Sequence, residues 1–99
     1  MRTRTVLVHG PSMLPTLREG DCLLIRGGAR VIPGDVVVAR FRERPSLLVV
    51  KRAVEERDGG WLLASDNPAV EGHGLTSGLG DVEAKVVLRY WPWPVRKLS

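Results

Sequence analysis

Short apolar runs separated by turn-forming residues set the strongest limit on how this chain folds. The runs are rich in Val, Leu and Ile, and several are apolar throughout, as in strands that are covered on both faces. Gly, Pro, Asp and Asn separate them, and these residues favour tight turns. We expect strands over residues 5–9, 21–26, 35–42, 47–55, 61–65 and 82–90.

Helical signals are weak by comparison. No window of ten or more residues has apolar positions at helical spacing, and the best candidate is one turn over residues 13–18, with Pro15 near its start. Asp58-Gly59-Gly60 joins two of the expected strands and predicts a β-hairpin. Residues 71–80 hold four glycines and are expected to form a mobile loop. The predicted fold class is therefore mostly β, with short, coiled strands and little helix.

The length of 99 residues supports one domain with one modest core. No stretch reaches the roughly 18–20 apolar residues that a membrane span needs, and the N-terminal apolar run is too short for a signal peptide. A lone cysteine, Cys22, cannot form an internal disulfide and is expected to be buried. We therefore expect residues 1–99 to form a single soluble domain with no transmembrane anchor, located in the cytoplasm.

The net charge of +4 could favour an anionic partner. The basic residues are interspersed with Asp and Glu, however, and no basic stretch is interleaved with aromatic residues, so a nucleic-acid partner is not expected. The segment Tyr90-Trp91-Pro92-Trp93-Pro94 is unusual because its prolines cannot extend a central strand. Its rings either cap the core, which we favour, or form a patch that binds a partner or a membrane interface.

Ser12 is the candidate nucleophile. It follows a predicted strand and lies in a turn bracketed by Pro11 and Pro15. Such a turn can expose the hydroxyl and place the backbone N–H beside it, as acyl transfer requires of a nucleophile and an oxyanion donor.

The serine needs a base, and Lys51 is the best candidate. His9 lies only three residues before Ser12, and His73 lies in the glycine-rich segment with no obvious carboxylate to orient it. Lys51 follows four apolar residues on an expected strand. Burial there would lower the pKa of its amine by about 3–5 units, which makes a lysine able to accept a proton near neutral pH. The alternative is a surface lysine with a buried stem.

Five segments in order resemble the conserved boxes of the type I signal peptidases, across nearly the whole chain. These segments are Ser12-Met13-Leu14-Pro15-Thr16-Leu17, Gly20-Asp21, Gly34-Asp35-Val36-Val37, Lys51-Arg52 and Ser65-Asp66-Asn67. The resemblance implies a signal-peptidase/LexA-like fold and a Ser-Lys endopeptidase that binds its substrate as an extended strand and cleaves after small residues. It also implies Ser12 as nucleophile and Lys51 as general base.

Further roles are implied by the same resemblance. The N–H of Ser12 would donate to the oxyanion, and Gly10 stands where some relatives supply a serine hydroxyl. Met13 and Pro15 match residues that shape the substrate-binding wall. Ser77 falls where the family has a serine that hydrogen-bonds the lysine.

Two departures from the family pattern affect the supporting residues Asp66 and Asn67. The usual Gly-Asp-Asn box has Ser65 in place of its glycine, and Gly78 stands where the family has an arginine after the loop serine. The Asp–Arg contact of the family is therefore not expected from that position.

Typical type I signal peptidases have a membrane anchor before the nucleophile segment, and we expect none in this chain. Among the relatives, the chain therefore most resembles the maturation proteases of nickel-type superoxide dismutase. This resemblance implies a protein substrate, the dismutase precursor, from which an N-terminal extension is removed. No cofactor and no metal are expected in the protease, and the chain has no Cys/His cluster with ligand spacing.

Two alternatives stay open. A LexA-like, self-cleaving repressor peptidase shares the Ser-Met-x-Pro turn and a later lysine, but only eleven residues precede Ser12 here, so we do not expect a DNA-binding segment. A catalytically idle module with the same fold, used for binding, is the other. The cleaved bond and the oligomeric state do not follow from the sequence.

Overall fold

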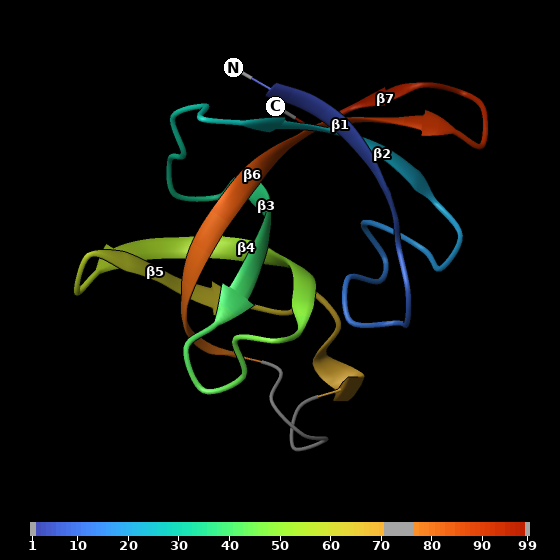
Figure 1. The fold of residues 1–99 in the computed structure, drawn as a ribbon. Helices are drawn as coiled ribbons and strands as arrows, with labels where there is room; N and C mark the ends of the chain where they lie inside the picture. Colours follow the sequence, from blue (N-terminus) through green and yellow to red (C-terminus); the bar gives the residue numbers. More distant parts are fainter. Residues whose placement is uncertain (1, 71–76, 99) are drawn as a thin grey trace.

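Seven strands form one antiparallel sheet in the computed structural model, which describes residues 2–70 and 77–98 (Figure 1). The strands are β1 (Arg2–Leu7), β2 (Cys22–Gly27), β3 (Val36–Phe41), β4 (Leu48–Arg57), β5 (Gly60–Ala64), β6 (Gly78–Trp91) and β7 (Arg96–Lys97). A single 3-10 turn of helix, η1 (Pro68–Val70), completes the described elements. The mostly-β fold class is thus confirmed.

The long strand β6 holds the sheet together. The strand order is β1-β2-β6-β3-β4-β5, and β6 pairs in addition with β5 and β7. The β5–β6 pairing closes β3, β4, β5 and β6 into a ring, and β1, β2 and β7 extend from the other part of β6 (Figure 1). Register shifts in its pairing with β2 and β3 let this strand bend between the two parts of the sheet.

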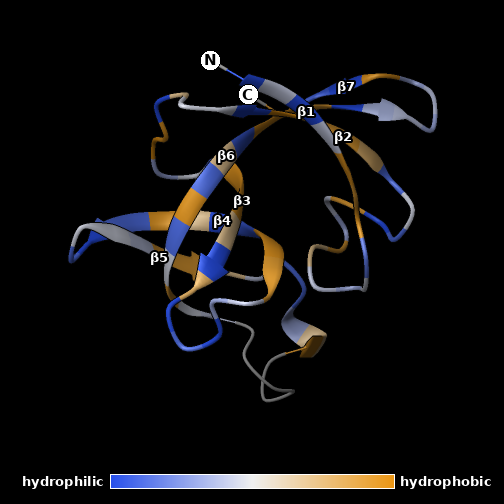
Figure 2. Cartoon of the chain, in the orientation of Figure 1, coloured by the Kyte–Doolittle hydropathy of each residue, from blue (hydrophilic) through white to orange (hydrophobic). Residues whose placement is uncertain are grey.

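Apolar side chains fill two clusters on opposite faces of β3. Val36 and Val38 belong to a cluster that includes Met13 and Leu17 from the segment between β1 and β2. Val37, Ala39 and Phe41 belong to the other cluster, with residues of β4 and β5. Successive residues of a strand point to opposite faces, so a fully apolar β3 is what this arrangement requires. Hydrophobic and hydrophilic residues alternate along β6, which is covered less completely (Figure 2).

Each of the six expected strands has a counterpart, and the hairpin through Asp58-Gly59-Gly60 is formed by β4 and β5. The first strand is displaced, because β1 covers Arg2–Leu7 instead of residues 5–9. The expected helical turn is a turn only, with the Leu17 N–H donating to the Met13 carbonyl at 2.9 Å. The helix η1 and the short strand β7 were not expected.

The expected loop over residues 71–80 is wrong at its end, because β6 already begins at Gly78. Residues 71–76 lie outside the described residues. Gly80 pairs with Phe41 on one side and Trp61 on the other, and a Cβ there would lie 2.8 Å from the Arg40 carbonyl oxygen. The glycine therefore serves the close approach of strands rather than flexibility.

The tryptophans of the C-terminal segment do not cap the core. The exposed fractions are 55% for Trp91 and 77% for Trp93, so the core-capping interpretation is wrong and the partner-binding alternative stays open. Cys22 is half-buried rather than buried. Within residues 2–70 and 77–98, no helix has the length and apolar character to cross a membrane.

Candidate active site

Ser12 lies in a closed loop between β1 and β2, which we call the Ser12 loop (residues 9–21). Its neck is closed by two backbone hydrogen bonds of 2.9 Å, from Val8 to Asp21 and from Gly20 to Val8. Met13 and Leu17 anchor the loop in the core, with exposed fractions of 1% and 0%. Both buried anchors follow the half-buried Ser12 in the chain, and they hold its backbone in place while the side chain stays accessible.

Lys51 lies on β4 and is buried, with an exposed fraction of 4%. Its Nζ donates a hydrogen bond of 2.7 Å to the Ser65 Oγ. Burial lowers the pKa of the Lys51 amine from its ordinary value, because the charged form loses solvation. A surface lysine is thereby excluded, and the amine has the environment that a general base needs.

The register of the β4–β5 hairpin explains the contact between Lys51 and Ser65. Arg52 pairs with Ala64. Lys51 precedes Arg52 and Ser65 follows Ala64, so these two residues lie opposite each other in the antiparallel pair. Side chains of directly opposed residues lie on the same face of an antiparallel pair, within contact distance. The turn alone does not fix this register, because a shift between Ala53 and Glu55 moves the pairing by one residue and so brings Lys51, rather than Arg52, opposite Ser65.

The residues after Ser65 bind the Ser12 loop. The Asn67 backbone N–H donates to the Ser12 carbonyl at 3.0 Å, and the Asn67 side-chain amide donates to the Pro11 carbonyl at 3.0 Å. One short segment, residues 65–67, therefore contacts both the Lys51 amine and the backbone of Ser12. This segment links Lys51 to the Ser12 backbone through Ser65 and Asn67, and no hydrogen bond joins the Ser12 hydroxyl directly to the Lys51 amine within the described part of the chain.

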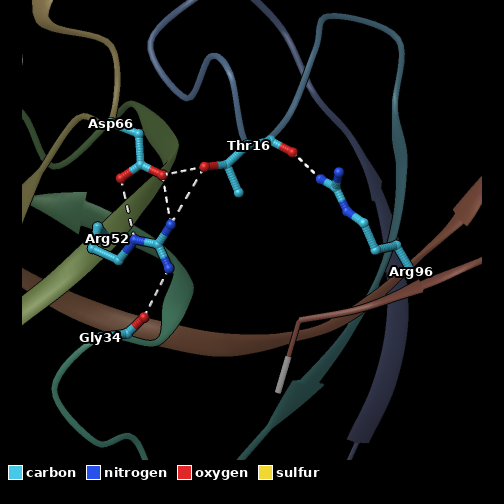
Figure 3. Close-up of polar contacts among 5 residues, drawn as sticks. All are labelled: Thr16, Gly34, Arg52, Asp66 and Arg96. Atoms are coloured by element: carbon cyan, nitrogen blue, oxygen red, sulfur yellow. Dashed lines mark hydrogen bonds and ion pairs between the residues drawn. The ribbon is translucent and has the colours of Figure 1, made fainter.

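Asp66 lies at the centre of a charged cluster beside these contacts (Figure 3). Its Oδ2 accepts from Arg52 Nη2 and from Thr16 Oγ1, both at 2.5 Å, and its Oδ1 accepts from Arg52 Nε at 3.1 Å. Arg52 Nη1 also donates to the Gly34 carbonyl at 2.8 Å. Burial acts to raise the pKa of Asp66, but the hydrogen bonds from Arg52 and Thr16 and the charge of Arg52 outweigh it and lower the pKa.

This cluster links three segments around the candidate catalytic pair. Thr16 belongs to the Ser12 loop, Arg52 follows Lys51, and Asp66 follows Ser65. The cluster is a bidentate Arg–carboxylate pair that is only partly exposed, the geometry in which ion pairs contribute most. The aspartate thus has an arginine partner, supplied by Arg52 and not by the position of Gly78.

The other residues predicted for the substrate site, Gly10, Met13 and Pro15, differ in their exposure and contacts. Gly10 has a φ of 80°, which favours glycine, and its N–H donates to Glu19 Oε1 at 3.1 Å. Pro15 is exposed, whereas Met13 lies in the core beneath the loop. Met13 can therefore support the wall of a substrate site but does not form its surface.

The expected contact between Lys51 and Ser77 is corrected by the structure, because Ser65 occupies that role. Ser77 is exposed and lines a small hollow with residues of the β3–β4 connection. Ser65 was missed because it stands where the family has glycine. The turn residues do not predict this contact, because the β-bulge between Ala53 and Glu55 shifts the register by one residue.

An open hollow is lined by other residues of the Ser12 loop, although not by Ser12 itself. It has a volume of about 690 Å³ and is lined by Gly10, Pro11, Leu14, Arg18 and Glu19, with more apolar than polar surface. The Ser12 N–H donates to no acceptor within the described ranges, and it is therefore free to bind an oxyanion. Another hollow of about 650 Å³, lined in part by residues of the β2–β3 connection and Trp61, includes none of the predicted site residues.

The described part of the chain has no group of three or more His, Cys, Asp or Glu side chains that could bind a metal ion.

The family model described as Peptidase S24-like matches residues 2–87. The chain belongs to the Peptidase S24-like family. The match includes all the candidate residues named above, from Gly10 to Ser77.

One curated relative of this Peptidase S24-like chain is mitochondrial inner membrane protease subunit 1 of Xenopus tropicalis, with 38% identity over 53 residues. The aligned region covers 50% of this chain and 32% of the Xenopus protein, so the chain spans about a third of that relative's length. No solved structure matches the chain.

Proposed function

We propose that this Peptidase S24-like chain is a serine endopeptidase in which Ser12 is the nucleophile and Lys51 the general base. The observation that carries the proposal is a buried lysine amine with a lowered pKa, hydrogen-bonded at 2.7 Å to Ser65 in the segment that also binds the Ser12 backbone. Burial of an amine costs solvation free energy, so a small domain rarely buries one unless its neutral form has a function.

In the first step the Ser12 oxygen attacks the carbonyl carbon of the scissile peptide bond, and its proton passes to the neutral Lys51 amine. The tetrahedral intermediate carries a negative charge on the former carbonyl oxygen, which accepts a hydrogen bond from the Ser12 N–H. Lys51 then returns the proton to the leaving nitrogen, the C–N bond breaks, and an ester forms on Ser12.

In the second step Lys51 removes a proton from water, and the resulting hydroxide attacks the ester. The C–O bond to Ser12 breaks, the serine regains a proton from Lys51, and the product leaves with a free carboxylate. Asp66 and Asn67 take no proton in this scheme. They hold the Ser12 loop against the segment that orients the lysine.

For the substrate, we propose the precursor of a nickel-type superoxide dismutase, cleaved in the cytoplasm so that its N-terminal extension is removed. The support is the resemblance of this chain to the maturation proteases of that dismutase. The hollow of the Ser12 loop, where Gly10, Pro11 and Leu14 form the apolar part of the lining, could accept small apolar side chains of an extended substrate.

Incubation with the precursor, followed by mass spectrometry of the products, tests the proposal. Wild-type protein should release the extension at one bond, and Ser12→Ala and Lys51→Ala should each abolish release while keeping the wild-type circular dichroism spectrum. His9→Ala is a matched control, because it removes the histidine that lies three residues before Ser12 in the sequence and should leave cleavage intact.

Cleavage by Lys51→Ala at the wild-type rate would exclude the lysine as base. Cleavage of a generic unfolded protein but not of the precursor would exclude the proposed substrate and keep the peptidase. A wild-type protein that cleaves neither would contradict the enzymatic function.

A further inference from the structure

Two arginines of the C-terminal hairpin contact the Ser12 loop. The hairpin consists of the end of β6, the turn through Pro92 and Pro94, and β7. Arg96 on β7 donates from Nη2 to the backbone carbonyl of Thr16 (Figure 3). Arg89 on β6 has Nη1 4.0 Å from the Asp21 Oδ2. One contact lies in the middle of the loop, and the other lies at its end.

The Arg89 contact is buried and secures the base of the hairpin. The side-chain exposed fractions are 13% for Arg89 and 4% for Asp21. Arg89 Nη2 also donates to the Pro94 carbonyl at 3.0 Å, and Asp21 Oδ2 accepts from the Arg18 N–H at 2.9 Å. Arg89 therefore contacts both the hairpin turn, at Pro94, and the end of the Ser12 loop, at Asp21.

Arg96 contacts Thr16, which makes hydrogen bonds on two sides. The Thr16 hydroxyl donates to Asp66, on the side of Lys51, and the Thr16 carbonyl accepts from Arg96, on the side of β7 (Figure 3). Thr16 lies four residues after Ser12, within the turn closed by the hydrogen bond from Leu17 to Met13. The two contacts on Thr16 thus fix the part of the loop that carries Ser12.

We infer that Arg96 is a positioning residue for Ser12, through its hydrogen bond to the Thr16 carbonyl. The C-terminal hairpin then acts as a strap that holds the Ser12 loop in register with Lys51. The segment at residues 65–67 fixes the loop from one side, and Arg96 fixes it from the other. The catalytic consequence of this inference rests on the proposed peptidase function.

Arg96→Gln tests the inference, with Arg96→Lys and Lys97→Gln as companions. Lys97 is the next residue of β7, is exposed, and makes no side-chain hydrogen bond or ion pair within the described part of the chain. Its substitution therefore removes the same charge from the same strand without removing the contact to Thr16. Hydrogen–deuterium exchange of residues 10–21 reports the order of the loop and needs no substrate.

We expect Arg96→Gln to raise amide exchange in residues 10–21 and to lower kcat about ten-fold or more, with little change in KM. Exchange in β3 and β4 should stay at the wild-type level, which separates loop release from general unfolding. Arg96→Lys keeps a cationic donor and should retain most of kcat, and Lys97→Gln should match wild type in both measurements.

Wild-type exchange in Arg96→Gln would overturn the inference. Faster exchange with an unchanged kcat would overturn it as well, because the order of the loop would then not matter for catalysis. If wild-type protein cleaves no peptide, the proposed function fails separately, and the exchange measurement still decides whether Arg96 orders the Ser12 loop.

Discussion

Lys51 and Ser65 face each other across β4 and the end of β5, with 2.7 Å between Nζ and Oγ. Ser65 directly precedes Asp66, which binds Arg52 and Thr16. The hydroxyl that orients the lysine amine is therefore attached to the cluster that holds the Ser12 loop. Orientation of the base and placement of the nucleophile share one short segment of chain.

Ser65→Ala should lower kcat by about ten-fold while KM changes little. The substitution removes the hydrogen bond that directs the Lys51 amine, and misdirected groups lose rate rather than substrate affinity. Ser77→Ala is the matched control and should have the wild-type kcat, because Ser77 is exposed. Steady-state kinetics of the two variants decide the point, and a larger loss in Ser77→Ala would restore the role that the family pattern gives to that serine.

The pH dependence of kcat/KM should show an ascending limb set by Lys51. The amine must be neutral to accept the Ser12 proton, so activity rises as pH passes through the pKa of Lys51 in the free enzyme. Burial lowers that pKa from its ordinary value of 10.5. The midpoint of the limb should therefore lie clearly below 10.5, and a midpoint at or above that value would show an amine in contact with water.

Much of the fold could be predicted from the sequence because the strands β2, β3, β4 and β5 each contain a bounded apolar run. The β4–β5 hairpin has a further signal in Asp58-Gly59-Gly60, and Asp58 and Gly59 have the positive φ values that this turn needs. The strand β7 could not be predicted, because two residues, Arg96 and Lys97, carry no periodic pattern. Its existence depends on pairing with β6 rather than on its own composition.

Candidate residues with a local signal were easier to find than those defined by contacts. Ser12 has its proline-bracketed turn, and Lys51 follows an apolar run, so each has a sequence signature. The Ser65 hydroxyl and the Arg52 guanidinium gain their roles only when β4 and β5 pair. Ser77 was predicted as the partner of the lysine from the family order alone, whereas the contact with Ser65 depends on a register that a bulge shifts by one residue.

Asp66→Asn should lower the free energy of unfolding by about 1–3 kcal/mol at pH 7, because two charge-assisted hydrogen bonds are weakened. The pKa of Asp66 is lowered in the folded state, so between the folded and unfolded values the unfolded chain binds more protons. This contribution is present above the unfolded value of about 3.9 and is lost as pH falls through the folded value. Urea titrations at pH 7 and at acidic pH measure it.

Asp81→Asn is the control for that titration. Asp81 also pairs with an arginine, Arg42, but both side chains are exposed, and exposed ion pairs contribute little. This variant should stay close to wild type at pH 7. A loss in Asp81→Asn equal to that in Asp66→Asn would show that the cluster at Asp66 has no special stabilising role.

Lys51→Met should abolish cleavage and leave the protein at least as stable as wild type at pH 7. Methionine fills a similar volume without an amine that must lose its hydration, and replacing buried ionisable groups by apolar ones is often stabilising. The pKa of Lys51 is lower in the folded state than in the unfolded state. At a pH between these two pKa values the unfolded chain binds more protons than the folded chain, so the stability of the wild-type protein rises with pH. The advantage of Lys51→Met should therefore be largest below the folded pKa and should shrink as pH approaches the unfolded value of about 10.4. Urea titrations from pH 6 to pH 10 measure this trend, and a variant that is clearly less stable than wild type at pH 7 would show that the lysine stabilises the fold instead of serving catalysis at its expense.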